Sequence, residues 1–168
     1  MRLRPATPAD APFLAALHAA VRADEVAAFG WPAPVADAFL GQQHAARERH
    51  YALAHPGAQD LLAEVDNAPV GRLLLDVRPG RIDLVDLAVH PAHQRAGHGT
   101  ALLAGVLARA DATGAGVRLT VRADNTGARR LYARLGFAVV ADDGLDLTLE
   151  RTTLAARTEV PHGSALRR

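Results

Sequence analysis

Residues 94–100 of this chain read QRAGHGT, and their types and spacing suit an anionic ligand. Gly97 and Gly99 lack a Cβ, so the backbone there can bend until successive N–H groups point inward. Such a nest at a helix N-terminus binds anionic groups, and the helix dipole strengthens the attraction. Arg95 adds a positive charge beside the glycines. The loop therefore predicts a site for a phosphate or pyrophosphate.

Known phosphate-binding loops differ in the residues that they require. A P-loop needs the pattern GxxxxGK[ST], in which a lysine reaches the terminal phosphates, and this chain contains no lysine. A dinucleotide loop needs GxGxxG, and its third glycine is missing because residues 100–102 (TAL) follow Gly99. The pattern that fits is Q/R-x-x-G-x-G/A, filled by Gln94, Gly97 and Gly99. An ordinary strand-to-helix turn containing glycine is the alternative interpretation.

A second group of chemically useful side chains lies farther along the chain, in a segment with helical spacing. Asn125, Ala128 and Tyr132 fall on one helix face, because residues three, four and seven apart align. A single tyrosine on a helix is more often a half-buried aromatic residue than a catalytic one. Here it belongs to the longer pattern N-x-x-A-x-x-x-Y-x-x-x-G-F, which ends at Phe137.

The two motifs, in this order and with a predicted strand between them, resemble the acetyl-coenzyme A loop and the second signature of the GNAT superfamily of N-acetyltransferases. The matching region runs from about Ile82 to Phe137. The resemblance implies an α/β fold with a central mixed, mostly antiparallel twisted sheet of six to seven strands, a parallel splayed pair, and helices on both faces. It also implies an acyltransferase that uses acetyl-CoA as cosubstrate and no metal.

The resemblance assigns roles to individual positions. The strand should bulge near Leu87 and Ala88, so that backbone groups of Leu87 and Val89 pair with the pantetheine arm. An N–H of Leu87 or Ala88 would hold the oxyanion of the thioester carbonyl. Asn125 would touch the pantetheine arm, and Tyr132 would protonate the departing thiolate as general acid. The predicted coenzyme-binding set is Leu87, Ala88, Val89, Gln94, Arg95, Ala96, Gly97, His98, Gly99, Thr100, Asn125, Ala128 and Tyr132.

Composition limits the mechanism independently of the resemblance. An acyl-enzyme route needs a nucleophile such as cysteine or serine. The chain has no cysteine, and its one serine is Ser164, close to the C-terminus. Direct attack of a bound primary amine on the thioester is therefore the simpler route, although a threonine or histidine nucleophile stays open.

Direct attack requires a group that takes a proton from the amine, and two carboxylates in an apolar strand are candidates. Asp83 and Asp86 are three residues apart, so they face opposite sides of a regular strand. Asp83 precedes Gln94 by eleven residues, an offset that resembles the base position of histone-type family members, where the residue is glutamate. The prediction is that Asp83 is the catalytic carboxylate if a carboxylate serves. Simple hydrogen bonding of both aspartates, with a water chain as base, is the alternative.

The elements that must position these residues follow from periodicity and turn signals. A single domain is expected over residues 1–151, followed by a polar tail over 152–168 that is expected to be poorly ordered. The predicted helices are a first one starting after Thr7, then Val35–Tyr51, Thr100–Thr113 and Asn125–Leu135. The predicted strands are Arg2–Pro5, Leu61–Val65, Val70–Val77, a central strand ending at Val89, Val117–Val121, Phe137–Val140 and Leu145–Leu149.

Charge and composition exclude several partner classes. The formal net charge is +1, which argues against nucleic acid and acidic membrane surfaces. The N-terminus lacks the apolar core of a signal peptide, and no apolar run is long enough to span a bilayer. A cytoplasmic protein, acting as monomer or homodimer, is the expectation.

Other side chains leave choices open. His90, His93 and His98 cluster near the loop, but no carboxylate or cysteine is spaced to complete a metal site. Trp31 and Tyr51 either wall an acceptor pocket or belong to the core. Two rival functions remain: a non-catalytic domain that binds or senses acyl-coenzyme A, and a nucleotide-binding module. Tyr132 argues against the first, and the missing lysine and third glycine argue against the second.

Overall fold

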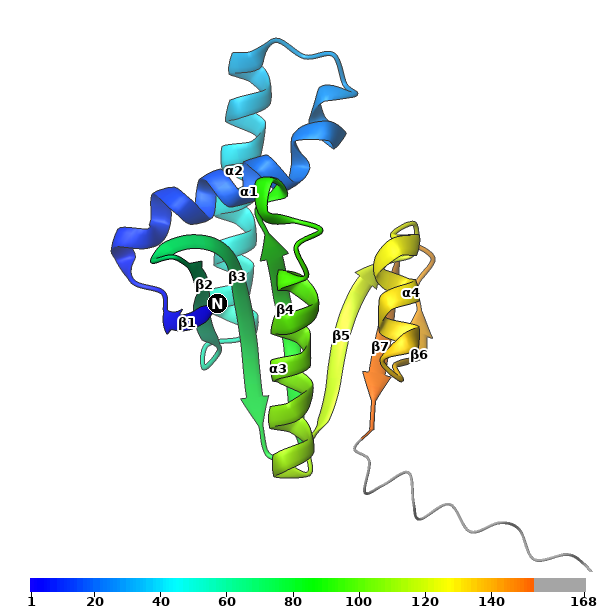
Figure 1. Cartoon of the computed structure of the whole chain (residues 1–168). Coiled ribbons are helices and arrows are strands. Elements are labelled where there is room, and N and C mark those ends of the chain that lie inside the picture. Colours follow the sequence, from blue (N-terminus) through cyan, green and yellow to red (C-terminus); the bar gives the residue numbers. More distant parts are fainter. Residues whose placement is uncertain (153–168) are drawn as a thin grey trace, which may run out of the picture. The chain divides into compact units, whose positions relative to one another are not determined.

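The structure, a computed structural model, describes residues 1–152 (Figure 1). The expected tail over 152–168 therefore lies almost wholly outside the described residues. The helices are α1 (Ala11–Ala27), α2 (Ala33–Ala54), α3 (His98–Thr113) and α4 (Thr126–Arg134), with short 3₁₀ turns at Pro8–Asp10 and Pro91–His93. The strands are β1 (Arg2–Pro5), β2 (Gln59–Val65), β3 (Ala68–Arg78), β4 (Arg81–Val89), β5 (Gly116–Arg122), β6 (Ala138–Asp142) and β7 (Asp146–Arg151).

The strands form one mixed sheet in the order β1-β2-β3-β4-β5-β7-β6, and the sheet contains a parallel pair. This confirms the predicted α/β fold with up to seven strands. The pairs β1/β2, β2/β3, β5/β7 and β6/β7 are antiparallel. The predicted elements are all present, with ends that move by a few residues. The largest extension is that of α2, which begins at Ala33 and ends at Ala54, where His55 and Gly57 break the pattern.

The described chain divides into two compact units. The first holds Met1–Val77 and Leu84–Ala104, and the second holds Arg78–Asp83 and the described residues from Gly105 onward. The two units share β4 and α3. A single domain over 1–151 stays a prediction of the sequence.

Within the first unit, a bulge in β3 decides which side chains reach which face. Glu64 of β2 pairs with Pro69 and Ala63 pairs with Gly71, so Val70 is an extra residue in β3. An extra residue shifts the alternation of the side chains from that point. As a result Val70 packs toward α3, while Arg72 reaches the opposite face.

The helices of the first unit cover both faces of its strands. Leu102 of α3 packs with a buried apolar cluster from β2, β3 and β4 that includes Val89. Side chains of α1 and α2 instead line a hollow with Asp86 and Ala88 of β4. Successive residues of a strand point to opposite faces, so α1 and α2 lie on one face and α3 on the other.

The second unit is built on the β5-β7-β6 strands. Val117, Leu119, Leu147 and Leu149 alternate inward from β5 and β7 and are buried. Phe137, directly before β6, is also buried. The helix α4 begins where the side-chain oxygen of Asn125 accepts a hydrogen bond from the Ala128 N–H at 3.1 Å, an N-cap that satisfies a donor of the first turn. None of the helices over residues 1–152 combines the length and apolar character needed to cross a membrane.

Candidate active site

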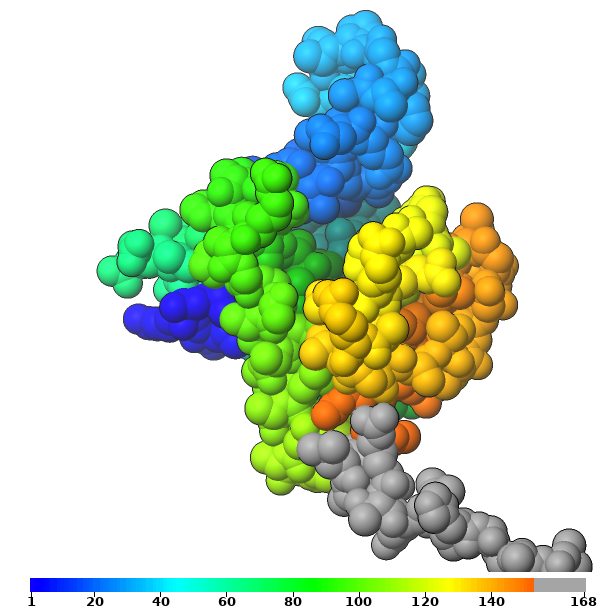
Figure 2. Space-filling view, turned by 45° about the vertical axis from the view of Figure 1, so that its right-hand side comes forward, coloured from blue at the N-terminus to red at the C-terminus, as the bar shows by residue number. Residues whose placement is uncertain are grey.

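The loop between β4 and α3 has the left-handed backbone that an anion nest requires, but not at both glycines. Gly97 has φ of 82° and Arg95 has φ of 62°, whereas Gly99 lies inside α3. The bend therefore uses one glycine and one arginine, and α3 starts two residues earlier than predicted. Residues 91–97 are exposed (Figure 2, green). An added Cβ at Gly97 would meet nothing within 4 Å, so the space above the loop is open.

The loop is anchored to the sheet by two hydrogen bonds, one to β4 and one to β3. The side-chain amide of Gln94 donates to the carbonyl oxygen of Val89 at 2.9 Å, and the His90 N–H donates to the carbonyl oxygen of Val70 at 2.8 Å. The first helical bond of α3 runs from the Ala101 N–H to the Gly97 carbonyl oxygen. The N–H groups before Ala101 therefore have no acceptor within the helix.

The end of β4 approaches β3 unusually closely. A Cβ built on Gly71 would lie 2.5 Å from the carbonyl oxygen of Ala88, so only glycine fits there. Leu87 and Val89 point toward the α3 side, and a Cβ on Gly99 would make ordinary contacts with both, at 3.9 and 3.8 Å. The predicted bulge of β4 at Leu87 and Ala88 stays a prediction.

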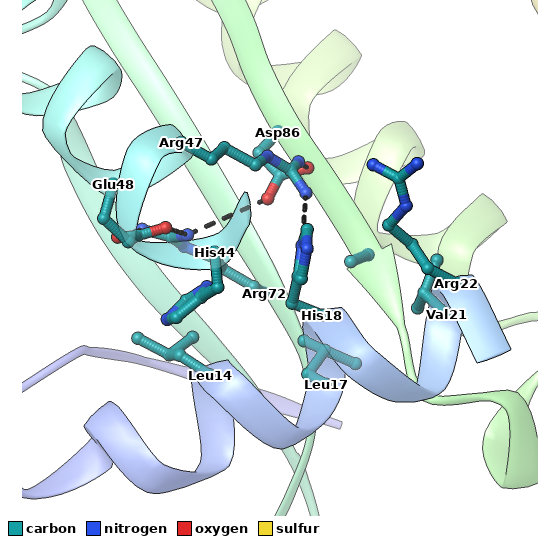
Figure 3. A pocket seen from close by; sticks show the side chains of 11 residues that line it. Leu14, Leu17, His18, Val21, Arg22, His44, Arg47, Glu48, Arg72 and Asp86 are labelled. Atoms are coloured by element: carbon teal, nitrogen blue, oxygen red, sulfur yellow. Dashed lines mark hydrogen bonds and ion pairs between the residues drawn. The ribbon is translucent and has the colours of Figure 1, made fainter. Parts of the chain in front are cut away.

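A hollow that is partly open to solvent lies on the other face of the first unit (Figure 3). Four elements that are far apart in the sequence supply its walls. The lining residues are Leu14, Leu17, His18, Val21 and Arg22 from α1, His44, Arg47 and Glu48 from α2, Arg72 from β3, and Asp86 and Ala88 from β4.

Asp86 is the buried carboxylate of this hollow. The Arg47 guanidinium donates to one of its oxygens, and Arg72 lies 3.9 Å from the other (Figure 3). Removal from water outweighs the attraction of both arginines, so burial raises the pKa of Asp86 above its ordinary value. A carboxylate with a raised pKa can exchange a proton closer to neutral pH.

Contacts with Tyr51, Glu48 and Asp60 hold the two arginines in place. Arg47 also donates to the Tyr51 hydroxyl oxygen at 2.5 Å, and the guanidinium carbons of Arg47 and Arg72 lie 5.2 and 5.7 Å from the centre of the Tyr51 ring. Arg72 makes paired hydrogen bonds to Glu48 and to Asp60. Burial and the Asp86 carboxylate together raise the pKa of Tyr51.

Asp83 has a different environment from Asp86. Its carboxylate lies 3.0 Å from the Nε of Arg81 and 3.9 Å from that of Arg78. Asp83 does not line the hollow, whereas Asp86 does. The expected opposite orientation of the two aspartates explains this difference, because only one parity of β4 faces α1 and α2.

The second motif lies in the second unit. Tyr132 is half-buried in α4, and its ring centre lies 5.5 Å from that of Phe137. Asn125 and Ala128 share the first turn of the same helix through the N-cap hydrogen bond. The predicted alignment of these three positions on one helix therefore agrees with the bounds of α4.

Trp31 and Tyr51, the two aromatic candidates for the wall of an acceptor pocket, have different surroundings. Trp31 packs with Phe29 and Phe39, at centre distances of 4.8 and 5.1 Å, and does not line the hollow. Tyr51 does not line the hollow either, but its hydroxyl group and ring contact Arg47 and Arg72, which do. His18, Arg47 and Arg72 were not identified from the sequence. Only His18 had a signal in the sequence: it follows Leu17, which helical spacing places on the inner face of α1.

The histidines near the loop do not gather with other ligands. His90 and His93 lie with ring centres 6.1 Å apart, and the His90 ring nitrogen accepts from the Ala92 N–H. Over residues 1–152 no group of three histidine, aspartate or glutamate side chains is placed to hold a metal ion.

Sequence comparison places residues 18–137, more than half of the chain, in the Acetyltransferase (GNAT) family. The mycothiol acetyltransferase of Saccharomonospora viridis is 46% identical over 72 residues, which cover 41% of this chain and 22% of that protein. The mycothiol acetyltransferase of Actinosynnema mirum is 37% identical over 117 residues, which cover 66% of this chain and 38% of that protein. The chain thus spans less than two fifths of the length of these relatives.

Solved structures share the fold. The PaiA N-acetyltransferase of Thermoplasma acidophilum, in complex with coenzyme A, has a TM-score of 0.67 at 18% identity and covers 90% of this chain and 98% of its own. A GNAT family acetyltransferase from Elizabethkingia anophelis, with acetyl-CoA bound, has a TM-score of 0.52 at 19% identity and covers 62% and 81%. The family match, together with the two motifs, the strand order and the shared fold, shows that the chain belongs to the GNAT family of acetyltransferases.

Proposed function

We propose that this chain transfers an acetyl group from acetyl-CoA directly to a primary amine, with no covalent enzyme intermediate. The observation that carries the proposal is the exposed loop before α3, with left-handed backbone at Arg95 and Gly97. Family membership and the coenzyme-bound structural relatives support the choice of ligand. The cytoplasmic location and the monomeric or homodimeric state remain predictions of the sequence.

The coenzyme-binding residues are those that the two motifs name. The N–H groups from Ala96 to Thr100, with Arg95 beside them, would hold the pyrophosphate. Backbone groups of Leu87 and Val89 would pair with the pantetheine arm, and Asn125 would contact it. The open space above Gly97 fits a ligand placed over the loop. The Gln94 side chain, bound to Val89, would keep the loop in position.

The chemistry requires two proton movements. The amine lone pair attacks the thioester carbonyl carbon, a C–N bond forms, and the oxygen charge is held by an N–H of Leu87 or Ala88. The C–S bond then breaks with its electron pair on sulfur, and the Tyr132 hydroxyl gives that sulfur its proton. A base removes the proton from the amine nitrogen. The phenol regains its proton from solvent.

The acceptor is an amine that enters the hollow of the first unit. The relatives are named for mycothiol, but the alignment covers too little of them to carry that acceptor over. Asp83 is the base that the motif offset predicts, and Asp86 is the carboxylate that lines the hollow.

Replacing Tyr132 with phenylalanine tests the proposal directly. Tyr132→Phe keeps the ring and removes the hydroxyl, so kcat should fall by about 10²–10⁴, the usual contribution of a positioned proton donor. The KM for acetyl-CoA should change little. The measurement is free-thiol release with a panel of primary amines. Tyr51→Phe, which removes the other tyrosine hydroxyl of the described chain, is the matched control and should have a smaller effect on kcat.

Two results would contradict the proposal in different ways. A kcat within a factor of two or three of the wild-type value in Tyr132→Phe would move the general acid to water or another residue. Acetyl-CoA binding by the wild-type chain without acetyl transfer to any amine class would favour the non-catalytic acyl-coenzyme A binding domain.

A further inference from the structure

His18 of α1 is a buried histidine, and its contact with Arg47 shows which ring nitrogen carries the proton. Its side chain is 6% exposed, and its Nδ1 lies 3.4 Å from a terminal nitrogen of Arg47. A guanidinium only donates hydrogen bonds, so Nδ1 must be the acceptor and the proton of the neutral ring is on Nε2. Burial, reinforced by Arg47, lowers the pKa of His18 to about 4, so the ring is neutral at pH 7.

The Nε2 of His18 is a buried donor without a protein partner. A buried N–H without an acceptor destabilises the fold, so a ligand that supplies an acceptor there would remove this cost. His18 lines the hollow, and its ring extends from α1 toward Asp86 and Arg47 (Figure 3).

Arg22 supplies a second donor of the same kind. It lies one helical turn after His18 on the same face of α1 and lines the same hollow. One terminal nitrogen pairs with Glu25 at 2.6 Å, but its Nε is buried without a partner. Two buried N–H groups without partners therefore belong to side chains that line the hollow.

The other charged groups of the hollow are already bound to each other. Arg47 is held by Asp86 and Tyr51, and Arg72 is held by Glu48 and Asp60. The apolar part of the lining comes from Leu14, Leu17 and Val21 of α1. A ligand that matches this surface combines an aliphatic group with oxygen acceptors.

We propose that the acceptor is an aliphatic α-amino acyl compound whose carboxylate or carbonyl oxygen accepts hydrogen bonds from His18 Nε2 and Arg22 Nε, with its side chain on Leu14, Leu17 and Val21. This rests on the proposed function and specifies its substrate class. The oxygen belongs either to a free amino acid or to the first residue of a peptide. The bonds orient the amine, so His18 and Arg22 are binding residues that determine specificity.

Three amines with one side chain test the proposal. Leucine carries the carboxylate, leucinamide carries a carbonyl oxygen, and 3-methylbutylamine carries neither. Because the pKa values of the three ammonium groups differ, kcat/KM is compared per unprotonated amine. This value for leucine or leucinamide should exceed that for 3-methylbutylamine at least tenfold, the ratio that about 1.4 kcal/mol represents. A higher value for leucine indicates a free amino acid as acceptor, and a higher value for leucinamide indicates a peptide.

Variants then assign the preference to the two donors. His18→Phe keeps a ring and removes Nε2–H, and Arg22→Met keeps much of the stem and removes Nε–H. Each should reduce the preference over 3-methylbutylamine to about threefold or less. His44→Phe is the matched control: its ring also lines the hollow, 5.5 Å from that of His18, and this variant should keep the preference. Equal kcat/KM for all three amines in the wild-type chain would overturn the proposal.

A binding measurement separates this proposal from the proposed function and needs no variant. In ¹⁵N-labelled wild-type protein, long-range imidazole ¹⁵N–¹H spectra should show the Nε2–H tautomer of His18. Its signal should shift on titration with leucine or leucinamide and not with 3-methylbutylamine. If this holds without acetyl transfer to any amine, the proposed function fails and the binding site stands. An Nδ1–H tautomer, or no selective shift, overturns the site.

Discussion

Asp86 is buried between two arginines and still has a raised pKa, because loss of water costs its charge more than Arg47 and Arg72 restore. It lines the hollow beside Ala88, the residue expected to contribute to the oxyanion site. Asp83, which the motif offset predicts as base, lies instead with Arg78 and Arg81. From these surroundings we expect Asp86, and not Asp83, to exchange the amine proton.

Substituting each aspartate tests this choice. The acidic limb of kcat/KM against pH should be lost or displaced in Asp86→Asn, with kcat lower by about 10²-fold or more. It should remain in Asp83→Asn. Asp86→Asn also leaves Arg47 without its carboxylate and should lower the free energy of unfolding by about 1–3 kcal/mol. Asp86→Glu, which restores the charge, should recover part of both losses.

The opposite outcomes have clear meanings. Loss of the limb in Asp83→Asn alone would return the role to the residue that the sequence predicted. An intact limb in both variants would mean that the proton leaves through ordered water. Varying the pKa of the amine substrate separates its own titration from that of the enzyme.

The neutral state of His18 predicts a pH dependence of stability. Its pKa falls from 6.5 in the unfolded chain to about 4 in the fold. The unfolded state therefore binds a proton first as the pH drops, and the stability that this group contributes above pH 6.5 is lost progressively between pH 6.5 and 4. The loss amounts to at most about 3 kcal/mol, because each tenfold change in proton affinity corresponds to about 1.4 kcal/mol.

Urea denaturation at about pH 7.5 and about pH 4.5, on either side of most of this window, measures the loss. The wild-type chain should lose more free energy of unfolding than His18→Gln, because glutamine does not titrate. An equal loss in both proteins would show that His18 is not buried in its neutral form.

At the scale of elements, the two glycines at the start of α3 differ in what the backbone requires of them. Gly97 needs its positive φ, so any side chain there strains the free protein. Gly99 is helical, and a Cβ would make ordinary contacts at 3.8 Å and beyond. An alanine at position 99 therefore fits the free protein, in agreement with a motif that admits glycine or alanine there.

Gly99→Val should weaken coenzyme binding, because the motif admits only glycine or alanine at this position. The wild-type chain should gain about 2.7 kcal/mol from acetyl-CoA at a hundredfold excess over Kd, and Gly99→Val and Gly97→Val should each lose most of that gain. Gly99→Ala, which the motif admits, should keep the gain and add up to about 1 kcal/mol of stability, the difference between alanine and glycine within a helix.

The matched control is Gly105→Ala in the same helix, where an added Cβ meets nothing within 4 Å. It should show the helix stabilisation and keep the full thermal shift with acetyl-CoA. Equal shifts in wild type, Gly97→Val and Gly99→Val would remove the loop from the coenzyme site.

At the scale of the whole molecule, part of the strand order β1-β2-β3-β4-β5-β7-β6 arises from signals that are local in the sequence. Turn residues such as Asp66 and Asn67, both with positive φ, join β2 to β3 as a hairpin. A helix between β4 and β5 is what a parallel pair requires, because its strands need a long crossover. The position of β7 between β5 and β6 follows from no local signal, because it depends on pairing with β5 across the length of α4 and β6.

The sequence by itself determined the elements, the coenzyme loop and the second motif, because each depends on residues a few positions apart whose spacing is set by helix or strand geometry. The hollow is different. His18, Arg47, Arg72 and Asp86 come from four elements, and no short-range spacing connects them. Their meeting depends on the packing of α1 and α2 over the strands and on the extra residue Val70, which places Arg72 on the face that α1 and α2 cover. The tertiary structure alone decided which aspartate lines the hollow and which donors lack partners, because both are consequences of burial and strand register.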